Sequence, residues 1–217
     1  MTQTYPVLYS FRRCPYAMRA RIAIFKANIK CEIREVVLKD KPESMLLLSE
    51  KGTVPVLLTP EQEVIEQSSD VMHWALNQHD PDNWLDEDAA QSQYLIDYND
   101  NEFKHFLDRY KYYVGYPEHP QEYYRDNAES FLKLIEKQLS ENSGVALLGN
   151  RISFVDMAIF PFIRQFAMVD LDWFKATSYE HLNQWFSNIE QSELFQGCMK
   201  KYDQWLPEHA PVYFPAS

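Results

Sequence analysis

The sequence predicts two domains, a small α/β domain at the N-terminus and an all-helical domain after it. Three observations predict this arrangement. Short apolar runs alternate with helical patterns over residues 5–78, five helical segments without a convincing strand follow residue 88, and the charge balance changes near residue 80. Residues 1–80 contain ten basic and ten acidic side chains, whereas residues 81–217 carry the whole formal net charge of −11.

The N-terminal part reads as a strand, a helix and a strand, followed by a second helix, a hairpin and a closing helix. A strand–helix–strand opening makes its two strands parallel, because the crossover helix returns the chain to the same end of the sheet. Thr59-Pro60 separates two short apolar runs and predicts the turn of the hairpin, and Ser68 or Ser69 is placed to cap the last helix. The expected strands are 5–9, 31–38, 54–58 and 63–65, and the expected helices are 19–28, 43–50 and 68–78.

The C-terminal part shows only helical periodicity. A turn-forming cluster, Asp80-Pro81-Asp82-Asn83, precedes it and marks a boundary. We therefore expect a first domain at 1–79, a linker at 80–90 and an all-helical domain at 91–217. Ser153 and Asp156 have the spacing of a capping box, and Ile152 before them can act as a hydrophobic staple. The expected helices are 89–113, 122–141, 153–168, 179–190 and 192–203.

Composition excludes several classes of function. The chain has 217 residues, 46% of them hydrophobic, which is enough to form a sizeable core. Its acidic charge argues against binding to nucleic acid or an anionic membrane, and no apolar run approaches the ~20 residues that cross a bilayer. The N-terminus lacks the pattern of a signal peptide, so we expect a cytoplasmic protein. Three cysteines and six histidines without ligand spacing predict neither a disulfide scaffold nor a metal site.

Cys14 carries the strongest chemical signal in the sequence. Pro15 follows it, and proline is favoured at the first position of a helix, so the sulfur should lie at a helix N-terminus. The unpaired amides and the dipole at that end favour an anion, and Arg12 and Arg13 add positive charge beside it. These influences lower the pKa of a thiol and favour a nucleophilic thiolate. The alternative is a small residue that merely packs at a strand–helix turn.

The sequence offers Cys14 no partner of the Cys-x-x-Cys type. Ala17 stands where the second cysteine of such a motif would be, so an external thiol has to resolve any mixed disulfide formed at Cys14. Cys31 lies in a β-rich run and Cys198 in an apolar-patterned helix, and we interpret both as packing residues.

At these residues the chain resembles the cytosolic glutathione transferases of bacterial type. The first domain looks most like that of the cysteine-type omega class and the larger two-domain glutaredoxins. The motifs occur in the family's order without insertions and extend the resemblance from residue 5 to about 160. They are Arg13-Cys14-Pro15-Tyr16-Ala17, Leu38–Glu43, Thr53–Leu57, Glu66-Gln67-Ser68 and Gly149–Asp156.

The resemblance implies a fold and a binding site. The fold would be a thioredoxin-like N-terminal domain with an all-α helical-bundle C-terminal domain, usually as a homodimer. Pro55 would be a cis-proline beside Cys14, and Val54 would offer its backbone to the cysteinyl part of glutathione. Gln67 and Ser68 would hold the γ-glutamyl carboxylate, and free amides at a helix start suit an anion. Lys41 matches a position that approaches the glycyl carboxylate.

The chain departs from the family at Gln67, where glutamate is common. An amide still forms hydrogen bonds but brings no charge. Glu66 is one position away, in a register that argues against its replacing the missing carboxylate. The aromatic stretch from Tyr110 to Tyr124 lines an apolar pocket or fills the bundle, and we favour packing.

These observations predict a glutathione-dependent thiol transferase, without a metal, that acts on a small disulfide or electrophile. The Cys14 thiolate would form a mixed disulfide with glutathione, and a second glutathione would resolve it; reduction of dehydroascorbate is a variant. One alternative is conjugation of glutathione to apolar electrophiles, for which Tyr9 or Ser10 could supply a hydroxyl. Another is a non-catalytic binding or regulatory protein on the same fold, since fold does not dictate function.

Overall fold

The computed structural model describes residues 4–215, which divide into two compact units. Unit 1 covers the chain up to Pro81 together with the segment from Ser192 onward, and unit 2 covers Asp82–Gln191. The expected helical domain at 91–217 differs from this division, because its last part groups with the N-terminal domain. No helix in residues 4–215 is both long enough and apolar enough to span a membrane.

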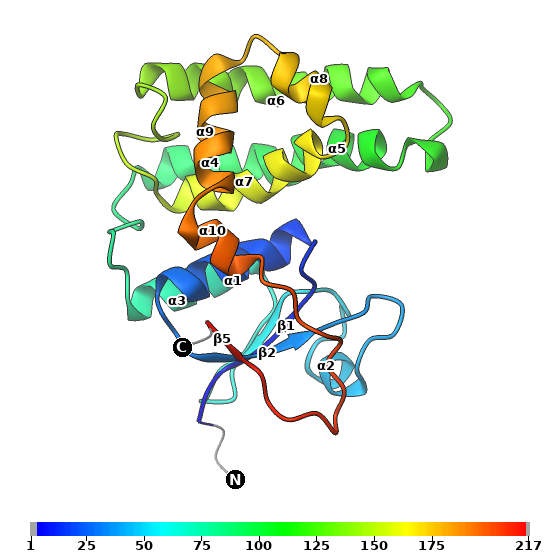
Figure 1. Cartoon of the computed structure of the whole chain (residues 1–217), viewed down its shortest axis with the longest axis vertical. Helices are drawn as coiled ribbons and strands as arrows, with labels where there is room; N and C mark the ends of the chain where they lie inside the picture. The colour runs from blue at the N-terminus through cyan, green and yellow to red at the C-terminus, as the bar shows by residue number, and fades with distance from the viewer. Residues whose placement is uncertain (1–3, 216–217) are drawn as a thin grey trace. The chain divides into compact units, whose positions relative to one another are not determined.

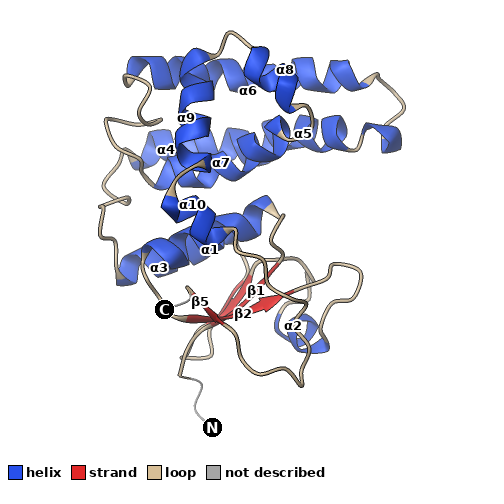
Figure 2. Ribbon diagram, viewed as in Figure 1, coloured by secondary structure: helices blue, strands red, loops and turns tan. Residues whose placement is uncertain are grey.

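Unit 1 is built on a five-stranded sheet with the order β4-β3-β1-β2-β5. Figure 2 draws strands in red. The pair β1–β2 is parallel, and the pairs β1–β3, β3–β4 and β2–β5 are antiparallel. Helices α1 and α3 pack on each other along one side of the sheet, and α2 lies on the other side (Figure 1). The elements are β1 (Val7–Ser10), α1 (Pro15–Lys26), β2 (Cys31–Glu35), α2 (Glu43–Leu48), β3 (Val56–Leu58), β4 (Val64–Ile65), α3 (Ser68–Gln78), α10 (Glu193–Cys198) and β5 (Tyr213–Phe214).

The parallel pair and the hairpin agree with the sequence-based expectation, and the predicted bounds of α3 match the structure. Helix α1 begins four residues earlier than the apolar periodicity indicates, because Pro15 starts it directly after Cys14. At α3 the N-cap is Gln67, which gives no side-chain cap hydrogen bond, and both Ser68 and Ser69 lie inside the helix. The prediction of a serine cap is therefore wrong.

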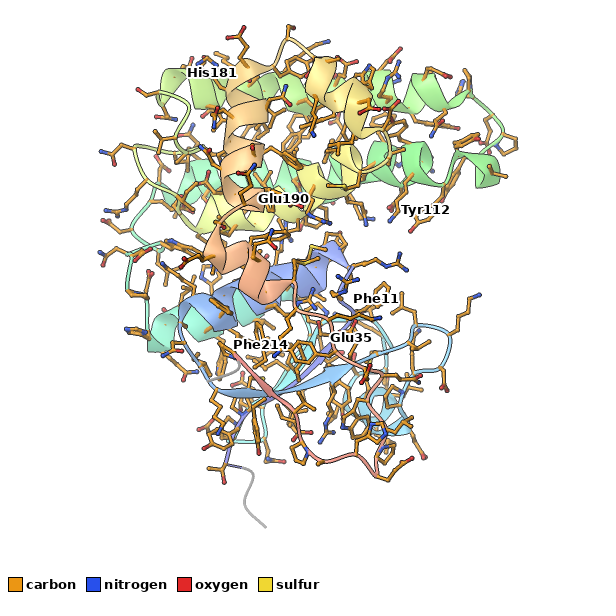
Figure 3. All side chains as sticks on the ribbon, viewed as in Figure 1. Phe11, Glu35, Tyr112, His181, Glu190 and Phe214 are labelled. Atoms are coloured by element: carbon orange, nitrogen blue, oxygen red, sulfur yellow. The ribbon has the colours of Figure 1, made fainter. Side chains whose placement is uncertain are left out.

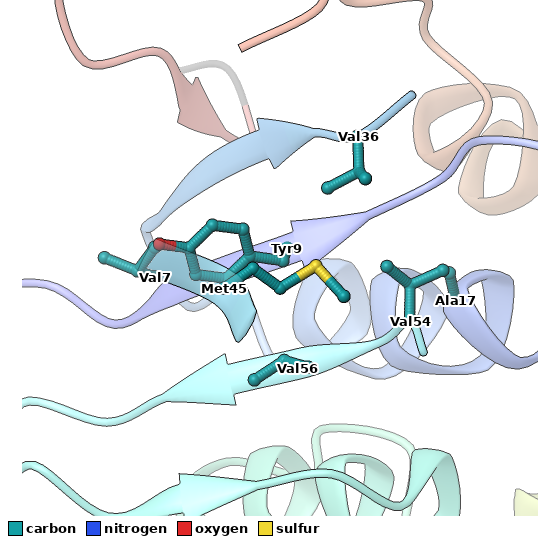
Figure 4. Close-up of a cluster of buried hydrophobic side chains, with 7 residues drawn as sticks. All are labelled: Val7, Tyr9, Ala17, Val36, Met45, Val54 and Val56. Atoms are coloured by element: carbon teal, nitrogen blue, oxygen red, sulfur yellow. The ribbon is translucent and has the colours of Figure 1, made fainter. Parts of the chain in front are cut away.

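A buried apolar cluster packs between the sheet and α2 and extends to Cys14 (Figure 4). Val7 and Tyr9 lie two residues apart on β1 and so face the same side of the sheet. They pack there with Met45 from α2 and Val56 from β3. Cys14 packs against this cluster from the start of α1, so the core itself supports the loop that carries the sulfur.

The C-terminal segment adds a helix and a strand to unit 1. Helix α10 packs on α1, and at Gly197 a Cβ atom would lie 2.5 Å from the Phe25 ring, so only glycine permits this approach. Further on, β5 pairs with β2 as an edge strand. The sequence predicted a helix over 192–203 and no strand after residue 80, and both predictions are corrected here. Two residues of strand paired across the chain leave no local periodicity to detect.

Unit 2 is an all-helical bundle around a central buried helix. Helix α7 has 12 of its 14 residues buried, and its capping box between Ser153 and Asp156 forms as predicted. The expected helix at 89–113 contains a π-helical turn in the middle, and the short α8 was not predicted because six residues show too little periodicity. The elements are α4 (Ala89–Tyr98), η1 (Asn99–Phe103), α5 (Lys104–Lys111), η2 (Tyr113–Gly115), α6 (Gln121–Glu141), α7 (Phe154–Ala167), α8 (Leu171–Ala176) and α9 (Glu180–Glu190).

Candidate functional site

Cys14 is the N-cap residue of α1, where the sequence predicts it, and its side chain is half-buried. Its backbone is extended, its N–H donates to the carbonyl of Phe11 at 3.0 Å, and its own carbonyl accepts from Met18 at 2.9 Å. The protonated thiol donates a weak hydrogen bond to the carbonyl oxygen of Val54, with Sγ 3.7 Å from that oxygen. The position at the N-terminus of a 12-residue helix has the opposite effect, because the amide dipoles that converge there favour the thiolate.

Pro15, Arg13 and Arg12, which we expected to favour a thiolate at Cys14, differ in their contacts. Pro15 is at the first helical position, as predicted. Arg13 is exposed, and its guanidinium lies over the ring of Phe11, 5.7 Å from the centroid. Arg12 contributes its backbone, because its N–H donates to the Glu35 carboxylate at 2.7 Å. The described contacts of Arg12 with Glu35 are therefore made by its main chain, and Arg13 has an exposed side chain.

The segment that faces Cys14 contains a cis peptide bond. The Val54–Pro55 bond is cis, as the family resemblance implies, and both residues are buried. The bond directly precedes β3 and leaves the Val54 carbonyl next to the Cys14 sulfur. The backbone of Val54 is therefore adjacent to the thiol.

The start of α3 brings Ser68 together with a buried arginine. The Ser68 hydroxyl accepts a hydrogen bond from Nη1 of Arg19 at 3.3 Å, and both side chains are buried. Arg19 also lies over the ring of Tyr16, 5.5 Å from the centroid. A helix N-terminus with a hydroxyl and a guanidinium beside it is an electropositive site for a carboxylate. The role of Arg19 was not predicted from the sequence, although an arginine between the apolar residues Met18 and Ala20 of α1 was a signal for it.

Gln67 is exposed and lines a cavity of about 430 Å³ on unit 1. Asp70 and Trp74 follow it at helical spacing and line the cavity from the same side of α3. Lys51, the strand residues Val64 and Ile65, and two further carboxylates complete the lining: Glu63 and Glu66. The charge that Gln67 lacks is therefore present one turn later in the helix, at Asp70.

Glu66 lines this cavity but already has other partners, and Lys41 lies outside the lining. The Glu66 carboxylate accepts a hydrogen bond from Ser49 and lies 4.0 Å from the ammonium of Lys51, so it already has two partners. Lys41 is exposed just before α2 and is not among the described residues that line the cavity. The structure brings Gln67 close to Glu66 but does not bring Lys41 to the same place.

The two hydroxyls considered as alternatives to Cys14 are both buried. The Tyr9 hydroxyl donates to Ser44 at 2.9 Å and accepts from Arg34 at 2.6 Å, so it points toward α2. Ser10 ends β1 with a fully buried side chain whose oxygen has no hydrogen-bond partner within residues 4–215. Neither hydroxyl is exposed to a ligand beside Cys14.

The other cysteines are packing residues, as predicted. Cys31 and Cys198 are buried, and burial raises the pKa of both thiols, which keeps them protonated. No disulfide and no group of three His, Cys, Asp or Glu residues placed to hold a metal occurs in the part of the chain that the structure describes. Cys14 is therefore the sulfur with access to solvent.

The aromatic stretch in unit 2 is only partly core. Tyr110 and Tyr124 are buried, in agreement with the packing interpretation, but Tyr112, Tyr113 and Tyr123 are exposed. Tyr112 precedes a 3₁₀ turn that begins at Tyr113 and ends at Gly115, and Tyr123 lies in α6. The turn breaks the helical period that the packing interpretation assumed. Figure 3 labels Tyr112 at the edge of unit 2.

Comparisons with known proteins identify both parts of the chain. The family described as "Glutathione S-transferase, N-terminal domain" matches residues 8–84, and "Glutathione S-transferase, C-terminal domain" matches residues 82–188. A curated relative, the glutathione S-transferase-like protein OpS6 of Beauveria bassiana (strain ARSEF 2860), is 20% identical over 199 residues, which cover 85% of this chain and 89% of the relative.

Solved structures share the fold at low sequence identity. Glutathione transferase Omega 3C from Trametes versicolor is 18% identical, with a TM-score of 0.75 over 94% of this chain and 87% of that one. A glutathione transferase family member from Pseudomonas fluorescens pf-5, solved with two glutathione bound, is 16% identical, with a TM-score of 0.73 over 90% of this chain and 92% of that one.

Proposed function

Because the chain belongs to the glutathione S-transferase family, we propose that it is a cysteine-type member that acts as a glutathione-dependent thiol transferase. The observation that carries the proposal is the position of the Cys14 sulfur. It lies at the N-terminus of α1 and 3.7 Å from the carbonyl beside a cis-proline. A nucleophilic cysteine needs this combination of a helix dipole and access for a second sulfur.

Glutathione would bind across the N-terminal ends of α1 and α3. Val54 and Pro55 would pair with its cysteinyl backbone, and the amides of α3, with Ser68 and Arg19 behind them, would hold the γ-glutamyl carboxylate. Gln67 would donate a hydrogen bond, and Asp70 on the same side of the cavity would attract the γ-glutamyl ammonium. Lys41 stays a proposed contact of the glycyl carboxylate.

The reaction would proceed in two exchanges. The Cys14 thiolate attacks the glutathionyl sulfur of a mixed disulfide, the S–S bond of the substrate breaks, and the released thiolate takes a proton from water. A second glutathione, as its thiolate, then attacks the Cys14–glutathione disulfide, which releases oxidised glutathione and restores the Cys14 thiolate. The net reaction consumes one mixed disulfide and one glutathione and produces one thiol and one glutathione disulfide.

The test compares wild type with Cys14→Ser in the glutathione-dependent reduction of the mixed disulfide between glutathione and 2-mercaptoethanol. We expect the variant to lose activity at least about 100-fold, because an alcohol is a very weak nucleophile at neutral pH. Cys31→Ala is the matched control, since that buried sulfur takes no part and the rate should be kept. Equal rates for wild type and Cys14→Ser would overturn the proposal.

The same variants separate the alternatives. If conjugation of glutathione to an aromatic halide survives in Cys14→Ala, the protein is a conjugating transferase; the burial of Tyr9 and Ser10 argues against this. If the wild type fails to bind immobilised glutathione, a non-catalytic role is favoured. The proposal also includes a homodimer in the cytoplasm, and light scattering of the purified protein tests the dimer.

A further inference from the structure

Arg21 is a fully buried arginine two turns along α1 from Cys14. Residues seven apart lie on the same face of a helix, and helical side chains lean toward the N-terminus. A long arginine at this position therefore directs its guanidinium back toward the loop that carries the sulfur. Arg12, in that loop, accepts a hydrogen bond from Nη2 of Arg21 through its carbonyl oxygen.

Glu35 holds the other side of the same peptide segment. Its Oε1 accepts the Arg12 N–H at 2.7 Å, while its Oε2 lies 3.8 Å from Nη1 of Arg21. The buried ion pair thus binds both backbone polar groups of Arg12, two residues before Cys14. Figure 3 labels Glu35 and Phe11, the residue next to Arg12, in this part of unit 1.

The C-terminal segment covers this pair. The sulfur of Met199 lies 3.9 Å from Nη2 of Arg21, and the N–H of Trp205 donates to the backbone carbonyl of Glu35 at 2.9 Å. Burial raises the pKa of Tyr202 in the same segment, and the charge of Arg21 opposes this effect. The C-terminal segment therefore covers much of this ion pair, and the Arg21 side chain is fully buried while that of Glu35 is 11% exposed.

The pair is not built for stability alone. Within residues 4–215, Nε and Nη1 of Arg21 and Oε2 of Glu35 are buried without a hydrogen-bond partner. A buried ion pair stabilises a fold only when its remaining polar atoms are also satisfied, and otherwise it roughly balances its own desolvation. The positive charge of Arg21 acts on its surroundings at low dielectric, and the Glu35 carboxylate offsets it in part.

We propose that Arg21 is a positioning residue for Cys14, whose guanidinium fixes the Arg12 backbone and favours the thiolate, with Glu35 as the carboxylate that limits this effect. This inference rests on the proposed function, in which Cys14 reacts as a thiolate. A buried arginine thereby takes the electrostatic role that we expected of Arg12 and Arg13 from the sequence.

The charges around Arg21 agree with this assignment. Burial lowers the pKa of Arg21, and the Glu35 carboxylate opposes this effect. An interaction between two charges is reciprocal, so a guanidinium that is held charged two turns along α1 from Cys14 favours the thiolate at that residue. Burial also raises the pKa of Glu35, against the effects of the Arg12 amide and of the two guanidinium groups.

The test measures the rate of iodoacetamide alkylation of Cys14 as a function of pH in the full chain. Arg21→Gln should shift the profile upward by about one pH unit and slow alkylation about tenfold below the transition. Glu35→Gln keeps an acceptor for the Arg12 N–H but removes the opposing charge, so the profile should shift downward. A merely structural pair would move the profile in the same direction in both variants, because both loosen the same loop.

Two further variants keep the test decisive. Arg34 lies on the neighbouring strand β2, pairs with Glu32 and has its guanidinium over the ring of Trp205. Arg34→Gln removes this charge and should leave the pH profile of Cys14 alkylation unchanged. If Arg21→Gln does not fold, Arg21→Lys retains the charge and should keep the wild-type position of the profile while turnover falls. A shift of about one unit in Arg21→Lys would overturn the electrostatic role.

The outcomes separate this inference from the proposed function. If wild-type Cys14 is alkylated with an apparent pKa near 8.5, the value of an ordinary thiol, the activated thiolate and the proposed function fail together. If the wild-type value is clearly lower and neither Arg21→Gln nor Glu35→Gln moves it, the proposed function stands and the role of Arg21 is refuted.

Discussion

Arg21 in unit 1 and Asp156 in unit 2 are both charged, both fully buried and both on a helix, but their surroundings differ. Asp156 accepts hydrogen bonds from Leu147 N–H at 2.9 Å, from the indole of Trp185 at 2.8 Å, and from the N–H and hydroxyl of Ser153 at 3.0 and 3.1 Å. Arg21 bonds to one carbonyl and leaves two nitrogens unsatisfied within the described residues.

The difference separates a structural charge from a functional one. Asp156 joins the start of α7 to the preceding loop and to α9, and every donor it contacts would otherwise be buried and unpaired. The Arg21 guanidinium lies beside the loop that precedes Cys14, and its hydrogen bonds satisfy fewer of its polar atoms than those of Asp156. We therefore expect the Asp156 network to dominate stability and the Arg21 pair to dominate reactivity.

Asp156→Ala should give the largest loss of stability. The substitution leaves the donors of Leu147, Trp185 and Ser153 without an acceptor, and each unpaired buried donor costs about 1–3 kcal/mol. We expect the free energy of unfolding to fall by at least about 3 kcal/mol in urea denaturation. A loss below about 1 kcal/mol would show that the network contributes little and would remove the contrast with Arg21.

Arg21→Met alone should cost about 2 kcal/mol, because it leaves the Glu35 carboxylate without its cation in a mostly buried site. The double variant Arg21→Met/Glu35→Leu should recover most of that loss, since apolar replacements of a buried ion pair are often neutral. A double-mutant cycle in denaturant measures this. If the loss in the double variant equals the sum of the two single losses, Arg21 and Glu35 are not coupled, and the contrast between this pair and the Asp156 network is contradicted.

The pH dependence of stability should also differ between the two sites. Burial raises the pKa of Asp156 from 3.8 to about 6, so between about pH 4 and pH 6 the folded protein binds a proton that the unfolded chain releases. The contribution of Asp156 to the free energy of unfolding therefore falls as pH rises through this window, by about 2 kcal/mol. Asp156→Asn should lack this component, and identical pH profiles for the two proteins would contradict the prediction.

Ser153→Ala should give the smallest effect. It removes one hydroxyl of the capping box at α7 but leaves the Ser153 backbone N–H on Asp156. The expected loss is about 1 kcal/mol in the same denaturation experiment. A loss as large as that of Asp156→Ala would mean that the hydroxyl, and not the carboxylate, organises the start of the helix.

Much of the fold was predictable from local patterns. Apolar periodicity located α3, α6, α7 and α9 to within one or two residues, and the proline after Cys14 located the start of α1. The strand β5 and the division of the chain between the units were not predictable, because they depend on pairing between residues 31–35 and 212–214. Local sequence carries no record of such a pairing.

The site was predictable to the extent that it is local. The position of Cys14 at a helix start, the absence of a second cysteine at Ala17 and the capping box at Ser153 all follow from neighbours within a few residues. The roles of Arg19 and Asp70 could not be predicted in this way. Arg19 lies beside Ser68, and Asp70 lines the same cavity as Gln67. The family resemblance named Ser68 and Gln67, but these contacts arise only from packing in the folded chain.

The sequence by itself determined which group we propose as the nucleophile: a cysteine before a proline at the start of a helix, within an 80-residue segment that has no net charge. The tertiary structure decided what surrounds it. Arg21 and Glu35 meet at the Arg12 backbone because α1 and β2 converge there, and the C-terminal segment seals them by joining the same sheet. The energy of interaction between two charges depends on the dielectric around them, and the dielectric depends on burial. Burial is a property of the fold and not of the local sequence.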